Sequence, residues 1–112
     1  MKIIIPTKYR EKLGSKVVAI RGVDGCIFLF TEKYWESLMS KIENAKLTKS
    51  EIVRDSSAGK FMALIKAGGT KITLDKNGAI TIPEYLTDYA GLTDASDIKF
   101  VEQKDWLEIW LQ

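Results

Sequence analysis

Apolar residues along this chain occur in two kinds of stretch. Short runs rich in Ile, Val and Phe, bounded by Gly, Pro, Asn or Asp, predict strands at residues 3–5, 17–20, 26–30, 70–74, 79–82, 98–101 and 106–110. Residues 31–46 carry apolar side chains at helical spacing behind the N-cap residue Thr31, and predict a helix. A second helix is expected to begin near Lys49 after Thr48, and the polar residues 55–59 are expected to break it.

Tight turns are predicted between three pairs of these strands. Asn77-Gly78 is the strongest signal, because the favoured two-residue hairpin turn needs positive φ angles that Asn and Gly adopt readily. Asp24-Gly25 predicts a second hairpin, and residues 103–105 a third.

One phrase occurs twice in the chain. The two prolines, Pro6 and Pro83, each follow a β-branched run and precede seven residues that end at a glycine, Gly14 or Gly91. Proline suits the start of a helix, and glycine suits the left-handed position that ends one. A pair of predicted strands then follows in both places. We therefore expect two copies of one folding unit, related by pseudo-twofold symmetry.

These phrases resemble a known family. Residues 74–83 and 89–92 resemble the second repeat of the MraZ proteins, residues 3–13 resemble the first, and residues 21–30 and 107–110 also fit. The resemblance implies an α+β, mainly β fold of two pseudo-symmetric AbrB/SpoVT-like swapped-hairpin repeats (double-split β-α-β) with connecting helices. It divides the chain into a truncated first repeat at 1–30, a helical connector at 31–69 and a second repeat at 70–112.

The same resemblance implies a function. MraZ proteins are transcriptional regulators that bind short direct DNA repeats, upstream of cell-division and cell-wall genes, as ring-like homo-oligomers. The expected partners are therefore double-stranded DNA, through its phosphates and major groove, and further copies of this chain.

The chain departs from the family pattern at the DNA-contacting signature, an aspartate and an arginine four residues apart before the proline. In the second repeat Asp75 is present, but Ala79 holds the arginine position. In the first repeat Lys2 matches the arginine, and the aspartate would lie before Met1. The helical tail after the final strand is also absent. The chain is thus a shortened, diverged member or one whose true start lies upstream, and Asp75 is expected to act as a turn-former.

A second hypothesis follows from this loss of the signature. The chain would then be a protein-interaction or assembly module of the same fold, or an antitoxin-like protein, that no longer binds DNA. Tight, salt-dependent DNA binding distinguishes the regulator from this alternative.

Charge is distributed unevenly along the chain. Residues 1–22 carry a net charge of +5, whereas residues 84–112 carry −5. The basic end is suited either to a phosphate backbone or to the acidic end of a neighbouring subunit. The candidate DNA-binding residues are Lys2, Lys8, Arg10, Lys12, Lys71 and Lys76.

The composition argues against catalysis. The chain has no histidine, one cysteine and no phosphate-binding glycine motif, so we expect no enzyme activity, catalytic residue, metal, cofactor or small-molecule substrate. Cys26 lies in an apolar run and is expected to be a buried structural thiol. No apolar run is long enough for a membrane span, which favours the cytoplasm. The resemblance to the MraZ proteins implies association with the nucleoid.

Two strands are expected to need a partner. The strand at 3–5 lacks a hairpin neighbour, so a swapped strand from the same or another chain should cover its edge. Trp106 alternates with Leu107, so one face of the last strand should be covered by a partner molecule. Both features predict a homo-oligomer.

Overall fold

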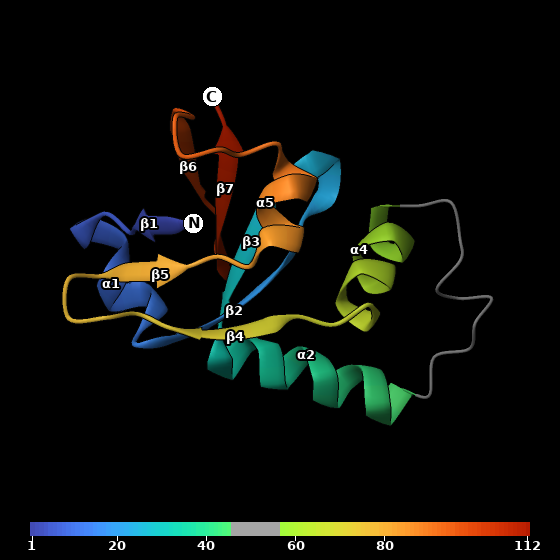
Figure 1. Ribbon diagram of the computed structural model, residues 1–112. Helices are drawn as coiled ribbons and strands as arrows, with labels where there is room; N and C mark the ends of the chain where they lie inside the picture. The colour runs from blue at the N-terminus through green and yellow to red at the C-terminus, as the bar shows by residue number, and fades with distance from the viewer. Residues whose placement is uncertain (46–56) are drawn as a thin grey trace.

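Antiparallel strands and four helices build the described part of the chain. The computed structural model describes residues 1–45 and 57–112. In chain order its elements are β1 (Lys2–Ile4), α1 (Thr7–Leu13), β2 (Lys16–Arg21), a 3-10 turn (Val23–Gly25), β3 (Ile27–Thr31), α2 (Glu32–Ala45), α4 (Ser57–Lys66), β4 (Thr70–Thr73), β5 (Ala79–Thr81), α5 (Glu84–Ala90), β6 (Ile98–Glu102) and β7 (Trp106–Leu111) (Figure 1). The predicted α+β fold class is confirmed.

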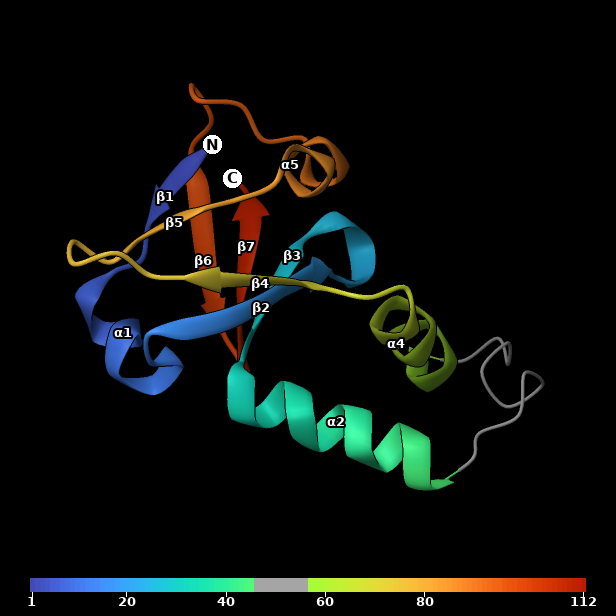
Figure 2. The ribbon, with the colours of Figure 1, turned by 60° about the horizontal axis from the view of Figure 1, so that its bottom comes forward.

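The strands form two sheets. β1 pairs with β5, and the larger sheet has the order β4-β2-β3-β7-β6. Consecutive side chains on a strand point to opposite faces, and β2 is buried on both. Val17 and Ala19 pack into one hydrophobic cluster with β1, β5, α1 and α5, whereas Val18 and Ile20 pack into another with α2 and α4 (Figure 2). Four consecutive apolar residues on β2 reflect this double burial.

The β1–β5 ladder relates the two repeats by a local twofold axis. Its register is Lys2↔Thr81, Ile3↔Ile80 and Ile4↔Ala79. The offset that carries Pro6 onto Pro83 also carries Ile3 onto Ile80, so the axis passes between these two isoleucines. The strand at residues 3–5 is expected to pair with a strand of the same chain or of another chain. The partner is β5 of the same chain.

Backbone hydrogen bonds on either side of this ladder follow the same symmetry. Ile5 N–H donates to the carbonyl of Gly78 at 2.9 Å, and Ile82 N–H donates to that of Met1 at 2.8 Å. The same offset carries the first bond onto the second. Each repeat therefore continues its strand to the residue before the proline.

The β4–β5 connection is less regular than a simple hairpin. Asp75 N–H still donates to the Ala79 carbonyl at 2.9 Å. Beyond this turn, however, β4 joins β2 and β5 joins β1, so the two strands enter different sheets. The predicted hairpin at 70–82 is thus correct only at its turn, because β4 pairs with β2 and β5 pairs with β1 instead of with each other.

Helix α2 covers the aromatic face of the large sheet. Thr31 caps it as expected, since its Oγ1 accepts the Tyr34 N–H at 3.0 Å. The Trp106 ring packs 5.3 Å from that of Phe28 and 6.3 Å from that of Tyr34, measured between centroids. The expectation that a partner molecule must cover one face of β7 is therefore wrong, because α2 of the same chain reaches it.

The predicted second helix is only partly tested. Its expected start near Lys49 lies outside the described residues. The break expected at 55–59 is wrong for residues 57–59, which belong to α4. Serine and glycine cost a helix only about 1 kcal/mol or less each relative to alanine, so neighbouring residues that favour the helix can override them.

Candidate nucleic-acid interface

The turn between β4 and β5 is held together by Asp75. Its Oδ1 accepts the N–H of Asn77 at 2.8 Å and of Ala79 at 2.9 Å, which confirms its predicted turn-forming role. These two bonds, first from Ala79 and then from Asn77, lower the pKa of Asp75, and the charges of Lys2 and Arg10 lower it further. Within residues 1–45 and 57–112, neither Lys2 nor Arg10 forms an ion pair with a carboxylate.

Arg10 reaches this turn from the first repeat. Its Nε donates to the carbonyl of Ile5 at 2.7 Å, which fixes the direction of the side chain. The guanidinium lies directly against Gly78, where a Cβ atom would collide with it. Gly78 also has a φ of +76°, a conformation that favours glycine. Arg10 therefore places a positive charge one residue from Ala79, the position at which the family signature has its arginine.

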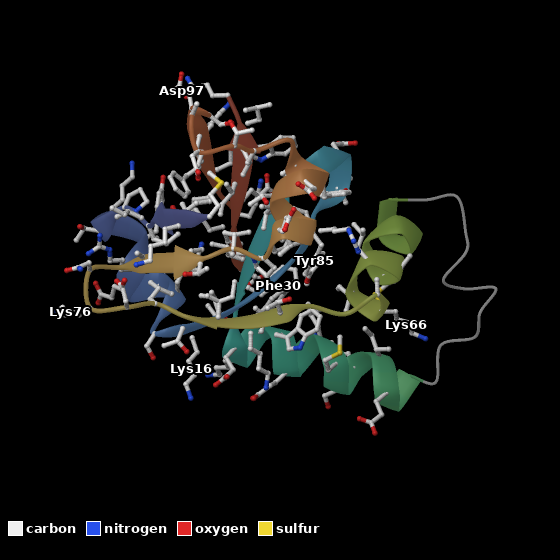
Figure 3. All side chains as sticks on the ribbon, viewed as in Figure 1. Lys16, Phe30, Lys66, Lys76, Tyr85 and Asp97 are labelled. Atoms are coloured by element: carbon white, nitrogen blue, oxygen red, sulfur yellow. The ribbon has the colours of Figure 1, made fainter. Side chains whose placement is uncertain are left out.

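Two lysines lie around the same turn. Lys2 is exposed on β1, and Lys76 is exposed within the turn itself. Figure 3 shows Lys76 at the end of the molecule opposite Lys66 of α4 (Figure 3). We call the set Lys2, Arg10 and Lys76 the basic rim. Lys8 is exposed on the same short helix as Arg10, with its Nζ 5.1 Å from the centre of the Tyr9 ring.

The other two candidate residues lie apart from the basic rim. Lys12 Nζ contacts the Gln103 carbonyl and lies 3.5 Å from Glu102 Oε2, so it is tied to the β6–β7 turn. Lys71 lies directly opposite Val18, and opposed residues in an antiparallel ladder share a face. Val18 belongs to the cluster beneath α2 and α4, so Lys71 lies on the side of the sheet that these helices cover.

One further charged cluster gave no signal in the sequence. The Arg21 guanidinium carbon lies 5.0 Å from the centre of the Tyr85 ring and 5.8 Å from that of Tyr89. Tyr89 donates its hydroxyl to the Gly22 carbonyl, and the Tyr85 hydroxyl lies 2.6 Å from Thr70 Oγ1. These contacts hold α5 against the end of β2. The partners lie far apart along the chain, and no local pattern connects them.

Comparison with known proteins places the chain. The family model described as "MraZ protein, putative antitoxin-like" matches residues 2–55. A protein of Natranaerobius thermophilus is 37% identical over 111 residues, which cover 99% of this chain and 72% of that protein. Proteins of Acetivibrio thermocellus and Caldanaerobacter subterraneus are 32% and 33% identical over 109 residues, covering 97% of this chain and 71% of each. All three are named transcriptional regulator MraZ. The chain belongs to the MraZ family.

Membership in the MraZ family confirms the predicted resemblance and the predicted class of transcriptional regulators. The similarity to these MraZ proteins extends over both proline-marked repeats. Across residues 1–45 and 57–112, no helix has the length and apolar character needed to cross a membrane.

Proposed function

We propose that this MraZ-family regulator contacts double-stranded DNA through the basic rim, and that it acts by binding rather than by catalysis. The rim is composite, because Lys2 and Arg10 come from the first repeat and Lys76 from the second. The proposal retains the division of the chain into repeats at 1–30 and 70–112 with a connector at 31–69. It requires no metal or cofactor.

The position of Arg10 against Gly78 is the observation that carries this proposal. An arginine already held by the Ile5 carbonyl loses less conformational freedom when it binds a phosphate. The turn beside it projects from one end of the molecule, where Figures 1 and 2 show it next to α1 and β1. A major groove about 12 Å wide admits a two-stranded β-ribbon, so the projecting turn can enter it while the flanking cations neutralise phosphates.

A homo-oligomer is the second part of the proposal. The open-edge argument for it no longer holds, since β5 covers β1 within the chain. The remaining support is charge, because residues 1–22 are strongly basic and residues 84–112 strongly acidic. A head-to-tail contact between these ends closes into a ring when the rotation permits. Each copy would then present one rim to one short DNA repeat, on the nucleoid in the cytoplasm.

The test is a DNA titration at about 50 and 200 mM salt, because removing phosphate contacts flattens the salt dependence by about 0.9 per contact. The variant Lys2→Ala/Arg10→Ala/Lys76→Ala, which removes the whole basic rim, should bind DNA more weakly and with a slope smaller by about 2 to 3. The matched control Lys33→Ala/Lys41→Ala/Lys66→Ala removes the same charge from exposed positions on α2 and α4 and should keep the slope.

Two results would contradict the proposal. Equal effects of both triple variants would show that net charge alone, and not the rim, carries the binding. No binding by the unaltered chain at low salt would instead support the assembly or antitoxin-like alternative, which the family description and Ala79 both favour.

A further inference from the structure

Ile4 is a large apolar side chain that the fold leaves in solvent. It is 64% exposed, more than any other large hydrophobic residue among the described side chains. Its sequence neighbours Ile3 and Ile5 are both buried in the core. Because consecutive residues of a strand point to opposite faces, Ile4 lies on the outward face of the ribbon that β1 forms with β5.

The other residues of this outward face are charged, polar or small. Lys2 shares the face with Ile4, because the two residues lie two positions apart on one strand, and it is exposed as well. Across the ladder, Thr81 lies opposite Lys2 and is exposed, whereas Ala79 lies opposite Ile4 and is buried. The apolar surface of this face is therefore confined to the side chain of Ile4.

The pseudo-twofold axis shows that this face is open in both repeats. The axis relates Ile4 to Thr81, and Thr81 is exposed although the β4–β5 turn leads directly into its strand. Figures 1 and 2 show β1 and β5 side by side at the end of the molecule that carries this turn. Ile4 thus lies on the same projecting part of the molecule as the basic rim.

The cations of the basic rim lie around this single apolar side chain. Lys2 is two residues away on the same strand. The Arg10 guanidinium lies against Gly78, which adjoins the residue opposite Ile4. Lys76 is exposed two residues before Gly78 in the turn. A ligand of this surface must therefore combine negative charge with one small apolar group.

Duplex DNA has both of these properties. Its phosphates are negative, and the C5-methyl group of thymine is the apolar group that lines the major groove. A protein partner fits this surface less well, because a specific protein interface buries about 800 Å² on each side and a single apolar residue among cations supplies only a small part of that area.

We propose that Ile4 contacts the C5-methyl group of thymine when the basic rim binds DNA, and that this contact gives the chain a preference for thymine at one position of its site. The inference rests on the proposed DNA binding by the rim. Phosphate contacts carry no sequence information, whereas an apolar contact in the major groove distinguishes thymine from the other three bases. Ile4 is then a specificity-determining residue, and the rim supplies the general affinity.

The experiment compares two duplexes of about 20 base pairs, one of alternating dA and dT and one with deoxyuridine in place of every dT, which removes only the methyl groups. Each base pair of the first duplex carries one thymine methyl, so every binding register meets one. The phosphates are the same, so the salt dependence of binding should be equal. We expect the full chain to bind the thymine duplex about fourfold more tightly, the factor that one buried methyl-sized group contributes.

Variants at position 4 test whether Ile4 contacts this methyl group. Ile4→Ala should bind both duplexes equally, because its short side chain no longer reaches the base. Ile4→Thr keeps the β-branch that favours a strand, matches the equivalent residue Thr81, and should keep part of the preference. The matched control Leu111→Ala removes the same number of carbon atoms from a 50% exposed position on β7 and should keep the full preference.

The outcomes separate this inference from the proposed function. Equal binding of both duplexes by the unaltered chain would overturn the inference and leave DNA binding by the rim intact. A preference that persists in Ile4→Ala would also overturn it, since the preference would then come from another residue or from the shape of the duplex. A lower subunit count for Ile4→Ala in light scattering, with both duplexes weakened alike, would assign Ile4 to a contact between copies instead. No binding to either duplex at low salt would contradict the proposed function, and this inference with it.

Discussion

Phe28 of β3 lies directly opposite Glu108 of β7, at the centre of the ladder that joins the two hairpins. The pairs on either side, Ile27 with Ile109 and Leu29 with Leu107, are apolar and related to each other by the pseudo-twofold axis. At the centre of the ladder, the pseudo-twofold axis therefore relates Phe28 to Glu108, so an aromatic ring in one repeat corresponds to a buried carboxylate in the other. Glu108 is only 7% exposed, and its two oxygens accept the indole N–H groups of Trp106 and Trp110, each at 2.9 Å.

Glu108 is predicted to stabilise the fold through these two indoles. Glu108→Ala leaves two largely buried donors without their acceptor, so the free energy of unfolding should fall by about 2 to 4 kcal/mol. Glu108→Gln keeps one acceptor oxygen and should lose about half as much. Urea unfolding followed by tryptophan fluorescence measures both. Glu84→Gln, at an exposed position on α5, is the control and should change stability by less than about 0.5 kcal/mol.

Gly78 is predicted to be required for two separable reasons. Gly78→Ala introduces both an unfavourable positive φ and a clash with Arg10. Gly68 also has a positive φ, of +94°, but nothing lies within 4 Å of its would-be Cβ. Gly68→Ala should therefore cost about 1 kcal/mol in unfolding free energy, and Gly78→Ala clearly more. If denaturant unfolding gives the same loss of unfolding free energy for Gly78→Ala and Gly68→Ala, Arg10 does not press against the turn.

Asp75 should make the β4–β5 turn sensitive to acid. Its pKa is lowered in the folded state, so its contribution to stability is present above the unfolded pKa and is lost as pH falls through the folded value. Amide protection of Asn77 and Ala79 should accordingly weaken below about pH 4, the ordinary aspartate range. Asp75→Asn should remove most of this pH dependence. A midpoint for Asp75 above the ordinary value in a carbon-detected NMR titration would contradict the assignment.

Cys26 should be inert in the folded chain. Burial raises the pKa of its thiol to about 12, with the charge of Glu108 adding to the effect, and its Sγ lies 3.3 Å from the Val23 carbonyl. Iodoacetamide at about pH 8 should therefore label Cys26 only after unfolding, since the thiolate is the reactive form. Stability should decline as pH rises above about 8.5, where the unfolded thiol begins to ionise. Rapid labelling of the native chain would contradict the predicted structural role.

Local features of the fold were predictable from the sequence, whereas contacts between distant segments were not. Pro6 and Gly14 bound α1. The proline ring fixes the φ angle of Pro6, and Gly14 readily adopts the positive φ angle that ends a helix. The turn bonds of Asp75 likewise depend on residues two and four positions away. The cover that α2 gives Trp106 and the placement of Lys71 on the side of the sheet that carries α2 and α4 depend instead on strand order, which periodicity does not encode.

The basic rim was predictable only in part for the same reason. Charge identified Lys2, Arg10 and Lys76 as candidates, but it equally identified Lys12 and Lys71. Only the swapped pairing of β1 with β5 brings the first repeat's α1 beside the second repeat's turn. That pairing also accounts for an arginine on α1 lying beside Ala79.

Mapping the DNA contact by NMR tests the central claim most directly. The full chain, labelled with nitrogen-15, would be titrated with a short duplex at low salt. The basic rim predicts that the largest amide shifts fall at Lys2, at Arg10 and across residues 75–79. Shifts confined to α2 and α4, or to the β6–β7 hairpin, would contradict it.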